Sequence, residues 1–442
     1  MKRIYDDKLL LWKANPQRKP LILRGVRQCG KTWSLKEFGR TEYENTVYIN
    51  FDETPHIAEF FTESKTPSRI IENLSIVAKT PIYPEKTLLI FDEIQECPDA
   101  LGSLKYFNEN APEYHVACAG SLLGMKVDGG ASFPVGKVDF LPVFPMTFTE
   151  VLTAIGEEEL AGYLSGFDKI EKIPLPFFSI LVEKLKLYFV TGGMPESVEK
   201  WIRLRDASES EDKLRDILFA YDIDFLKHLD ASTAQKVTRV WNSLPSQLAK
   251  ENKKFHYKLV KEGAGAREYE DAIDWLTDVS LVYRVNRIKA PGLPIQAYED
   301  QDAFKLYAAD VGLLRRLSGL DPSAYGEGSR LFTEFKGALA ENYILQALTK
   351  AYEPKLRYWT SYNPTWEVDF VLQHKNDVIP IEVKSGTDNK GKALAVYRER
   401  YHDLTKLRIR YSLLNLDFSD DLLNIPLFMA DQTKRLIDLA TG

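Results

Sequence analysis

The chain has 442 residues, which is too long for one hydrophobic core and indicates two or more domains. Hydrophobic residues make up 44% and charged residues 28% of the chain, which excludes a disordered or fibrous protein. Its 58 basic and 64 acidic residues give a net charge of -6, which excludes a uniformly basic nucleic-acid-binding body but leaves a local basic face open.

Export and membrane insertion are not indicated by the sequence. No apolar run reaches the ~18 residues of a membrane-spanning helix, and charged residues interrupt the richest stretch, 177–190. The first residues lack the apolar core of a secretory signal. The three cysteines, Cys29, Cys97 and Cys118, form no CxxC pair. We therefore expect a cytoplasmic protein with no membrane partner and with reduced thiols.

The first third of the chain alternates short apolar runs with segments of helix length. The runs that we expect to be strands are 20–26, 46–51, 87–93, 114–121 and 138–145. This alternation predicts an α/β fold, in which helices cover both faces of a parallel sheet. We assign it to an N-terminal domain, residues 1–146.

A glycine-rich loop follows the first of these strands. Its sequence, GVRQCGKT, satisfies the pattern G-x-x-x-x-G-K-[ST] and leads into a helical stretch. The glycines let the backbone N–H groups face a phosphate, and Lys31 is expected to bind the β and γ oxygens and Thr32 a magnesium ion. We therefore expect ATP and Mg²⁺ as cofactors. The nucleotide-binding residues would be Gly25, Val26, Arg27, Gln28, Cys29, Gly30, Lys31 and Thr32.

Two carboxylates end the strand LLIFDE, and they suit ATP hydrolysis. Asp92 is expected to hold magnesium together with Thr32, and Glu93 to activate water. Ser121, at the end of the next strand, is a candidate to sense the γ-phosphate or orient the water. The alternative for Asp92 and Glu93 is a pair of solvated loop acids, which the order of the two motifs disfavours.

The middle of the chain changes to helical periodicity. Residues 147–230 place apolar residues three and four apart, which predicts a helical lid region. Residues 231–325 read as short helices followed by a strand pair, so we predict a winged-helix-like region there. Acidic residues on the helix around Arg267 argue against a DNA-facing surface on this region.

The C-terminal region, 326–442, contains a second set of carboxylates. Glu341 lies in an expected helix, Asp369 in an alternating strand, and Glu382 and Lys384 in the next strand. This order resembles a PD-(D/E)xK nuclease core, although Val368 stands where that pattern has proline. The resemblance implies an α/β nuclease-like domain with a divalent metal on Glu341, Asp369 and Glu382, and with Lys384 positioning water. The alternative is an inactivated nuclease fold kept as a recognition module.

Several motifs together resemble the bacterial and archaeal AAA+ type P-loop ATPases that carry a C-terminal domain of unknown function. They are GVRQCGKT, LLIFDEIQECP, AGSLLG, FLPVFPMTFTEVL and TGGMPE, and the resemblance spans nearly the whole chain. That family commonly has a Gly-Arg pair where this chain has Gly136 and Lys137. The resemblance implies a catalytic or sensor role for Lys137, which keeps the charge but lacks the planar fork of arginine. A surface cation is the alternative.

Two functions follow from these observations. The first is an ATPase (ATP hydrolase) that couples its nucleotide state to the nuclease-like domain and acts on DNA, which basic residues beyond Lys384 would contact. The second is a slow nucleotide-dependent switch that binds a protein partner, with the C-terminal domain as a docking module. A small-molecule kinase is disfavoured by the Asp92-Glu93 pair. The sequence does not define the oligomeric state.

Overall fold

The structure is a computed structural model that describes residues 1–120, 133–250, 253–322, 333–352, 355–361, 366–386 and 391–442. It divides into two compact units. The first comprises Met1–Pro145 with Asp278–Ser280, and the second comprises Met146–Thr277 and Leu281–Gly442. The boundaries that the sequence suggests at 230/231 and 325/326 both fall inside the second unit and stay predictions.

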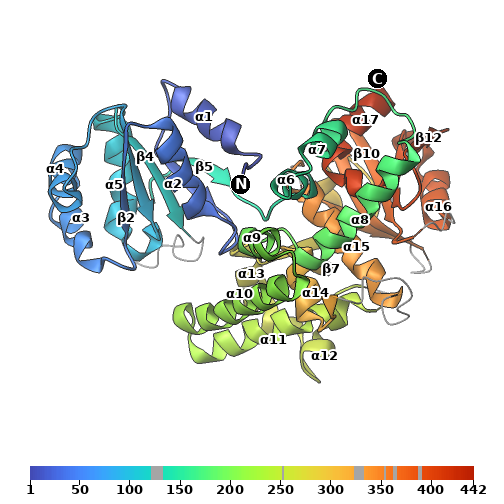
Figure 1. Cartoon of the computed structure of the whole chain (residues 1–442). Helices are drawn as coiled ribbons and strands as arrows, with labels where there is room; N and C mark the ends of the chain where they lie inside the picture. Colours follow the sequence, from blue (N-terminus) through green and yellow to red (C-terminus); the bar gives the residue numbers. More distant parts are fainter. Residues whose placement is uncertain (121–132, 251–252, 323–332, 353–354, 362–365, 387–390) are drawn as a thin grey trace. The chain divides into compact units, whose positions relative to one another are not determined.

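The described strands of the first unit form one parallel sheet with the order β2-β3-β4-β1-β5 (Figure 1). They are β1 (Leu21–Arg24), β2 (Asn45–Asn50), β3 (Thr87–Asp92), β4 (His115–Gly120) and β5 (Asp139–Pro142). β3 and β4 lie inside the sheet and are buried along their whole length, as expected for apolar runs covered on both faces. The parallel α/β sheet predicted from the sequence is confirmed.

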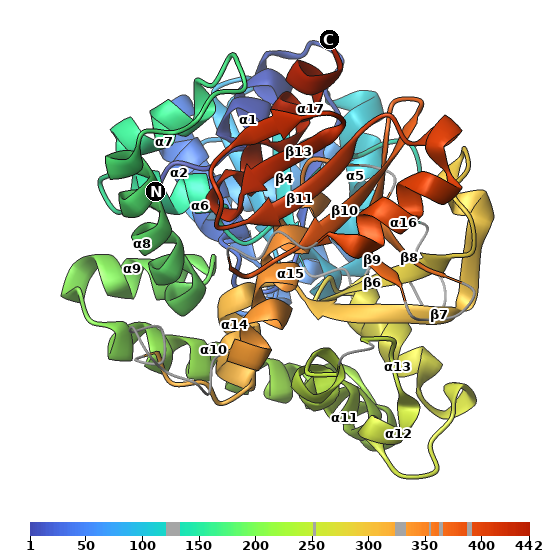
Figure 2. The same cartoon turned by 90° about the vertical axis from the view of Figure 1, so that its right-hand side faces the viewer.

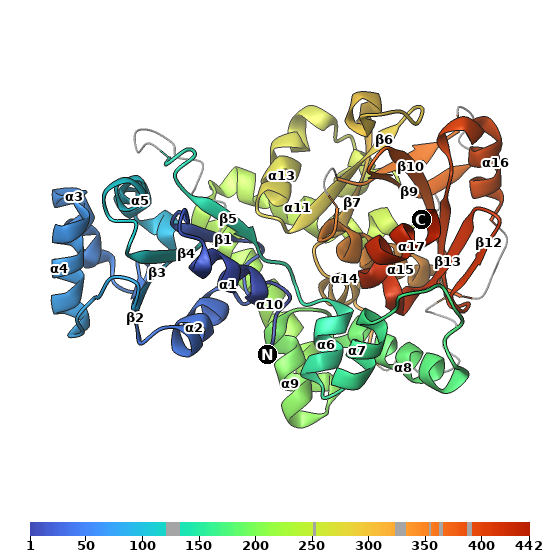
Figure 3. The same ribbon diagram turned by 90° about the horizontal axis from the view of Figure 1, so that it is seen from above.

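Helices cover both faces of this sheet. Figures 1 and 3 show α2 on one side and the pair α3 and α4 on the other. A core of aromatic rings joins the second side to the sheet: Phe61 contacts both Phe51 and Phe91 edge to face, with centroids 5.5 and 5.6 Å apart. The helices are α1 (Asp6–Ala14), α2 (Lys31–Glu42), α3 (Glu59–Glu63), α4 (Pro67–Ala78) and α5 (Pro98–Asn110), with short 3₁₀ turns η1 (Pro55–Ala58) and η2 (Ile94–Glu96).

The second unit begins with a series of helices. A capping box starts the first of them, because Glu150 N donates to the Thr147 hydroxyl and Thr147 N donates to the Glu150 carboxylate. Gly192, with φ of +66°, ends α8. The helices are α6 (Phe148–Ala154), α7 (Glu158–Ser165), α8 (Leu175–Thr191), α9 (Pro195–Leu204), α10 (Ala207–His228), α11 (Ala231–Leu248), α12 (Tyr257–Val260) and α13 (Ala266–Asp278).

In the described part of the second unit, eight strands form one mixed sheet with the order β12-β13-β11-β10-β9-β8-β6-β7. Figure 2 shows β13, β11 and β10 side by side. The strands are β6 (Val282–Ile288), β7 (Glu299–Ala308), β8 (Arg357–Thr360), β9 (Glu367–His374), β10 (Asp377–Val383), β11 (Arg408–Ser412), β12 (Asp417–Ser419) and β13 (Leu422–Pro426). The hairpin of β6 and β7 belongs to the region predicted to be winged-helix-like, yet β6 pairs in parallel with β8. That hairpin therefore extends the C-terminal sheet.

The remaining helices pack against this sheet. α16 buries Leu394 and Tyr397 against a cluster that includes Trp359 and Val368. The helices are α14 (Val311–Leu317), α15 (Thr333–Thr349), α16 (Lys392–Arg400) and α17 (Thr433–Thr441), with 3₁₀ turns η4 (Ile295–Tyr298), η7 (His402–Leu404) and η8 (Leu427–Gln432).

Asp310 joins three segments of the second unit. Its carboxylate accepts hydrogen bonds from Gly193 N at 2.7 Å, from Leu313 N at 3.0 Å and from the Gln346 amide at 3.2 Å. The side chain is fully buried, and burial raises the pKa of Asp310 while these donors oppose the shift. The turn after α8, the first turn of α14 and helix α15 are thus held by one carboxylate.

We expect Asp310→Ala to lower the free energy of unfolding by about 3 kcal/mol, because it leaves buried donors without an acceptor. Urea denaturation measures the loss. The matched control is Asp230→Ala, which removes the exposed N-cap acceptor of Ser232 N and Thr233 N. It should cost only about 1 kcal/mol. Equal losses in the two variants would show that Asp310 is an ordinary helix cap.

Candidate nucleotide-binding site

The glycine-rich loop has the backbone that a phosphate-binding loop needs. A Cβ at Gly25 would collide with the carbonyl oxygen of Val143, so only glycine fits there. Gln28 and Gly30 have positive φ angles of +64° and +93°. These turns bring the loop directly into α2, whose free N–H groups and positive end favour an anion.

The loop lysine and threonine lie where the sequence predicts them. Lys31 is 9% exposed, and its ammonium donates to the carbonyl oxygens of Gly25 at 2.9 Å and Val26 at 3.0 Å. The ammonium therefore lies against the loop itself. Thr32 follows in the first turn of α2, and its hydroxyl points to the carboxylate of Asp92.

Asp92 ends β3 and brings the two sequence motifs together. The Thr32 hydroxyl lies 3.1 and 3.0 Å from the two oxygens of Asp92. Burial raises the pKa of Asp92, while hydrogen bonds from Tyr48 and Thr32 oppose that rise. A hydroxyl beside a carboxylate is a donor set that suits Mg²⁺, so these residues fit the expected ion.

Glu93 follows Asp92 in an unusual backbone conformation. Its φ of +48° and ψ of +47° are left-handed, which costs a non-glycine residue on the order of 1 kcal/mol. Its backbone N–H donates to Asp92 Oδ1 at 3.1 Å, and its carboxylate accepts from the Gln95 amide at 2.5 Å. The turn and the amide together fix the Glu93 carboxylate beside Asp92.

Tyr48 is a residue of this site that sequence analysis missed. Its hydroxyl donates to Asp92 Oδ2 at 2.8 Å, and the Lys36 ammonium lies 3.5 Å from its ring centroid. Burial raises the pKa of Tyr48, and the hydrogen bond to Asp92 raises it further. The signal that could have indicated Tyr48 is its place in the strand TVYIN. This strand, β2, pairs with β3 so that Asn50, two residues after Tyr48, lies opposite Asp92.

We expect Tyr48→Phe to raise the Mg²⁺ concentration needed for half-maximal ATP hydrolysis by about fivefold, which corresponds to the free energy of one lost hydrogen bond. The Phe ring keeps the packing but no longer orients the Asp92 carboxylate. A magnesium titration of the ATPase rate measures the effect. Tyr83→Phe, at an exposed tyrosine, is the control and should leave the titration unchanged. An unshifted titration in Tyr48→Phe would remove the positioning role.

Arg3 is a second residue that the sequence did not reveal. It is 4% exposed, and its guanidinium donates to the carbonyl oxygens of Cys29 at 3.0 Å and Phe144 at 2.7 Å. It therefore joins the phosphate-binding loop to the segment after β5. Its partners are 26 and 141 residues away in the chain, so no local pattern predicts the contact.

Of the two other predicted catalytic residues, the structure places only Lys137. Ser121 lies outside the described residues. Lys137 precedes β5, and its ammonium pairs with Glu109 at 2.8 Å. Because β5 runs parallel to β1, with Asp139 opposite Leu21, Lys137 lies near the amino ends of the strands, whereas the glycine-rich loop follows their carboxyl ends. A catalytic role for Lys137 stays a prediction.

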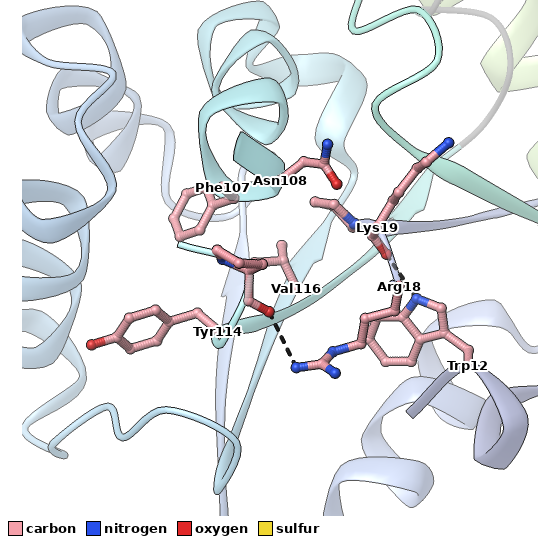
Figure 4. Close-up of a pocket in the computed structure, with 9 residues that line it drawn as sticks. Trp12, Arg18, Lys19, Phe107, Asn108, Tyr114 and Val116 are labelled. Atoms are coloured by element: carbon pink, nitrogen blue, oxygen red, sulfur yellow. Dashed lines mark hydrogen bonds between the residues drawn. The ribbon is translucent and has the colours of Figure 1, made fainter. Parts of the chain in front are cut away.

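A small cavity also lies at the amino ends of the strands (Figure 4). Arg18 closes it by donating to Pro112 O at 3.1 Å, and Trp12 donates to Lys19 O at 2.7 Å. Its volume of about 10 Å³ is close to the room that one water molecule needs. It is too small for a nucleotide.

In the second unit, two of the carboxylates predicted to bind metal, Glu341 and Glu382, are buried, and Asp369 is partly buried. Glu341 accepts from the Tyr307 hydroxyl at 3.1 Å and pairs with the Lys253 ammonium. Asp369 accepts from Val383 N at 2.7 Å. Burial, followed by the charge of Glu341, raises the pKa of Asp369 to about 7.

The other two predicted residues of this region contact each other. Lys384 Nζ lies 2.9 Å from Glu382 Oε1, while Glu382 Oε2 is buried without a hydrogen-bond partner. No group of three His, Cys, Asp or Glu side chains that could hold a metal occurs among the described residues. Sequence analysis missed Lys305, which is fully buried and pairs with Glu367. The metal and water-positioning roles stay predictions.

The first unit is thus a P-loop NTPase domain. Its parallel sheet carries the phosphate-binding loop after β1 and a carboxylate pair after β3. Residues 17–152 match the family model described as an AAA domain, so this is an AAA-type P-loop ATPase domain. Residues 182–324 and 336–428 match models described as domains of unknown function, DUF8612 and DUF4143. No curated protein matches the chain.

Solved structures show weaker likenesses. A Walker-type ATPase of Pyrococcus abyssi has a TM-score of 0.44 and 13% identity, covering 72% of this chain and 95% of that one. A STAND protein of Pyrococcus horikoshii has a TM-score of 0.26 and 10% identity, with coverages of 78% and 45%. Cdc6p of Pyrobaculum aerophilum has a TM-score of 0.26 and 13% identity, covering 71% of this chain and 90% of that one. The ATPase assignment rests on the AAA match and the site.

In the part of the chain that the structure describes, no helix has the length and apolarity to span a bilayer.

Proposed function

We propose that the protein binds ATP with magnesium at the loop Gly25–Thr32 and hydrolyses it. The observation that carries this proposal is the meeting of Thr32, Asp92 and Glu93 at the carboxyl ends of β1 and β3. These are the groups that ATP hydrolysis requires: oxygen ligands for the ion and a carboxylate beside them.

Each group of the nucleotide-binding site has its own role in this proposal. Backbone N–H groups of the loop and the Lys31 ammonium bind the phosphates, and Lys31 exchanges its bonds to Gly25 and Val26 for phosphate oxygens. Thr32 and Asp92 hold the magnesium ion, which neutralises charge on the phosphates. Glu93 accepts the proton of the attacking water.

The geometry of the first unit also supports coupling to the rest of the chain. Cys29 Sγ lies 3.6 Å from Val143 O, and Arg3 joins Cys29 to Phe144. Val143 and Phe144 immediately precede Pro145, where the main segment of the first unit ends. A change in the loop on nucleotide binding therefore reaches the chain segment that leads out of the unit.

For the second unit, the sequence suggested a nuclease-like domain that acts on DNA, with a non-catalytic docking module for a protein partner as the alternative. A specific observation favours the docking module: lysines pair with Glu341 and Glu367. Arg398, one of the basic residues expected to meet DNA, pairs with Asp421 at 2.5 Å. We therefore propose a nucleotide-dependent switch whose C-terminal domain has a nuclease-like fold but binds a protein.

The test is to measure ATP turnover by the purified protein with and without duplex and single-stranded DNA, while following the DNA on a gel. Slow turnover that DNA does not change, with intact DNA, supports the switch. Turnover stimulated by DNA, together with metal-dependent cleavage, supports the nuclease machine instead. No turnover under any of these conditions would refute the ATPase itself.

A further inference from the structure

Lys305 is a fully buried cation inside the carboxylate cluster of the second unit. It lies in β7, is 0% exposed, and its ammonium pairs with Glu367. Burial lowers the pKa of Lys305, but the charges of Glu367, Glu341 and Asp369 outweigh that effect and raise it above its usual value. The side chain is therefore charged, and it pairs directly with one of these three carboxylates, Glu367.

Lys253 supplies a second cation to the same cluster. Its ammonium pairs with Glu341 Oε1, and its side chain is 16% exposed. The other oxygen of Glu341 accepts from the Tyr307 hydroxyl at 3.1 Å. Both oxygens of Glu341 thus already have donors supplied by the protein.

The charges of the cluster nearly balance without any added ion. Glu341, Glu367 and Asp369 face the two ammonium groups of Lys253 and Lys305. Each ammonium pairs with one carboxylate, Lys253 with Glu341 and Lys305 with Glu367, so these two pairs carry no net charge. Buried charges are tolerated when they are paired in this way.

These contacts do not fit a divalent metal on the residues that the nuclease resemblance implies. A metal on Glu341 would have to displace the Lys253 ammonium, which already pairs with one of its oxygens. One oxygen of Asp369 accepts from Val383 N, and one oxygen of Glu382 pairs with Lys384. Among the described residues, the unpartnered oxygen of Glu382 belongs to no group of three His, Cys, Asp or Glu side chains that could hold a metal.

We infer that Lys253 and Lys305 are built-in cations that take the place of a metal ion in this cluster, so that the C-terminal sheet folds and acts without metal and does not cleave nucleic acid. Both lysines come from the segment 231–325, whereas the carboxylates lie in 336–428. The pair of Lys305 with Glu367 therefore also joins β7 to the C-terminal region, and the pair of Lys253 with Glu341 joins it to the residues before α12. The inference concerns the second unit alone and stands whether or not the first unit hydrolyses ATP.

The test measures Mn²⁺ binding by electron paramagnetic resonance and thermal unfolding with and without Mn²⁺. The protein used is the full chain without nucleotide. It carries Asp92→Asn, which removes metal binding at the ATP site. This parent protein should bind no Mn²⁺ and should unfold at the same temperature with or without it. Lys305→Met should unfold at a lower temperature than the parent, because the carboxylates then lack their cation. Mn²⁺ should restore part of that lost stability. The variant should also bind Mn²⁺ at least about tenfold more tightly than the parent does.

Lys253→Met is the second variant, because its partly exposed side chain makes loss of folding less of a risk, and it should gain Mn²⁺ binding in the same direction. Lys375→Met is the control: its exposed ammonium pairs with Asp438 at 2.6 Å, and no change in Mn²⁺ binding is expected. Mn²⁺ binding by the parent that Asp369→Asn abolishes would overturn the inference. Failure of both cluster variants to gain Mn²⁺ would overturn it as well.

Discussion

Glu93→Gln should bind ATP as tightly as the wild type and hydrolyse it about 100-fold or more slowly. Glutamine has the shape of glutamate, and it can occupy the left-handed position after β3, but it cannot accept a proton from water. Binding should persist because Lys31 and Thr32, which meet the phosphates and the ion, are unchanged. Phosphate release in a single turnover measures the rate, and a fluorescent ATP analogue measures the affinity.

The matched control is Glu96→Gln, which removes the same charge three residues further on, at an exposed position of η2. Its turnover should equal that of the wild type. A wild-type rate in Glu93→Gln would place the base elsewhere. A joint loss of ATP binding and turnover would instead mean that Glu93 supports the structure of the loop.

The ATPase fold could be predicted because its signals are local. Each strand of the first sheet is a short apolar run, and the phosphate-binding loop and the Asp92-Glu93 pair directly follow two of these runs. In a parallel sheet, the carboxyl ends of such strands meet at one edge. The contact between Thr32 and Asp92, 60 residues apart, therefore follows from the topology alone.

The rest of the site depends on pairings that the sequence does not encode locally. Tyr48 reaches Asp92 only because β2 lies next to β3, and a strand order is not written in any one strand. The carboxylate cluster of the second unit depends even more on such distant pairings. Its carboxylates could be recognised by their order, but Lys253 and Lys305 lie 88 and 62 residues before their partners, in a region read as a separate winged helix.

Lys31→Ala should weaken ATP binding by about 100-fold or more, because it removes a charge-assisted contact to two phosphates in a largely buried position. Calorimetric titration with ATP and magnesium measures the loss. Arg40→Ala is the matched control, since it removes one positive charge from the exposed side of the same helix, where Arg40 pairs with Glu37. Its ATP affinity should match that of the wild type.

The Lys31 ammonium also donates to two loop carbonyls, so the loss of binding has two possible causes. Lys31→Arg separates them. It keeps the charge, but the wider guanidinium does not fit a side chain that is only 9% exposed. Weak binding in both variants, with an unfolding temperature equal to the wild type, means that the ammonium must sit at one point of an intact loop. Wild-type affinity in Lys31→Ala would remove the phosphate-binding assignment, and with it the reason for expecting Thr32, Asp92 and Glu93 to act on ATP.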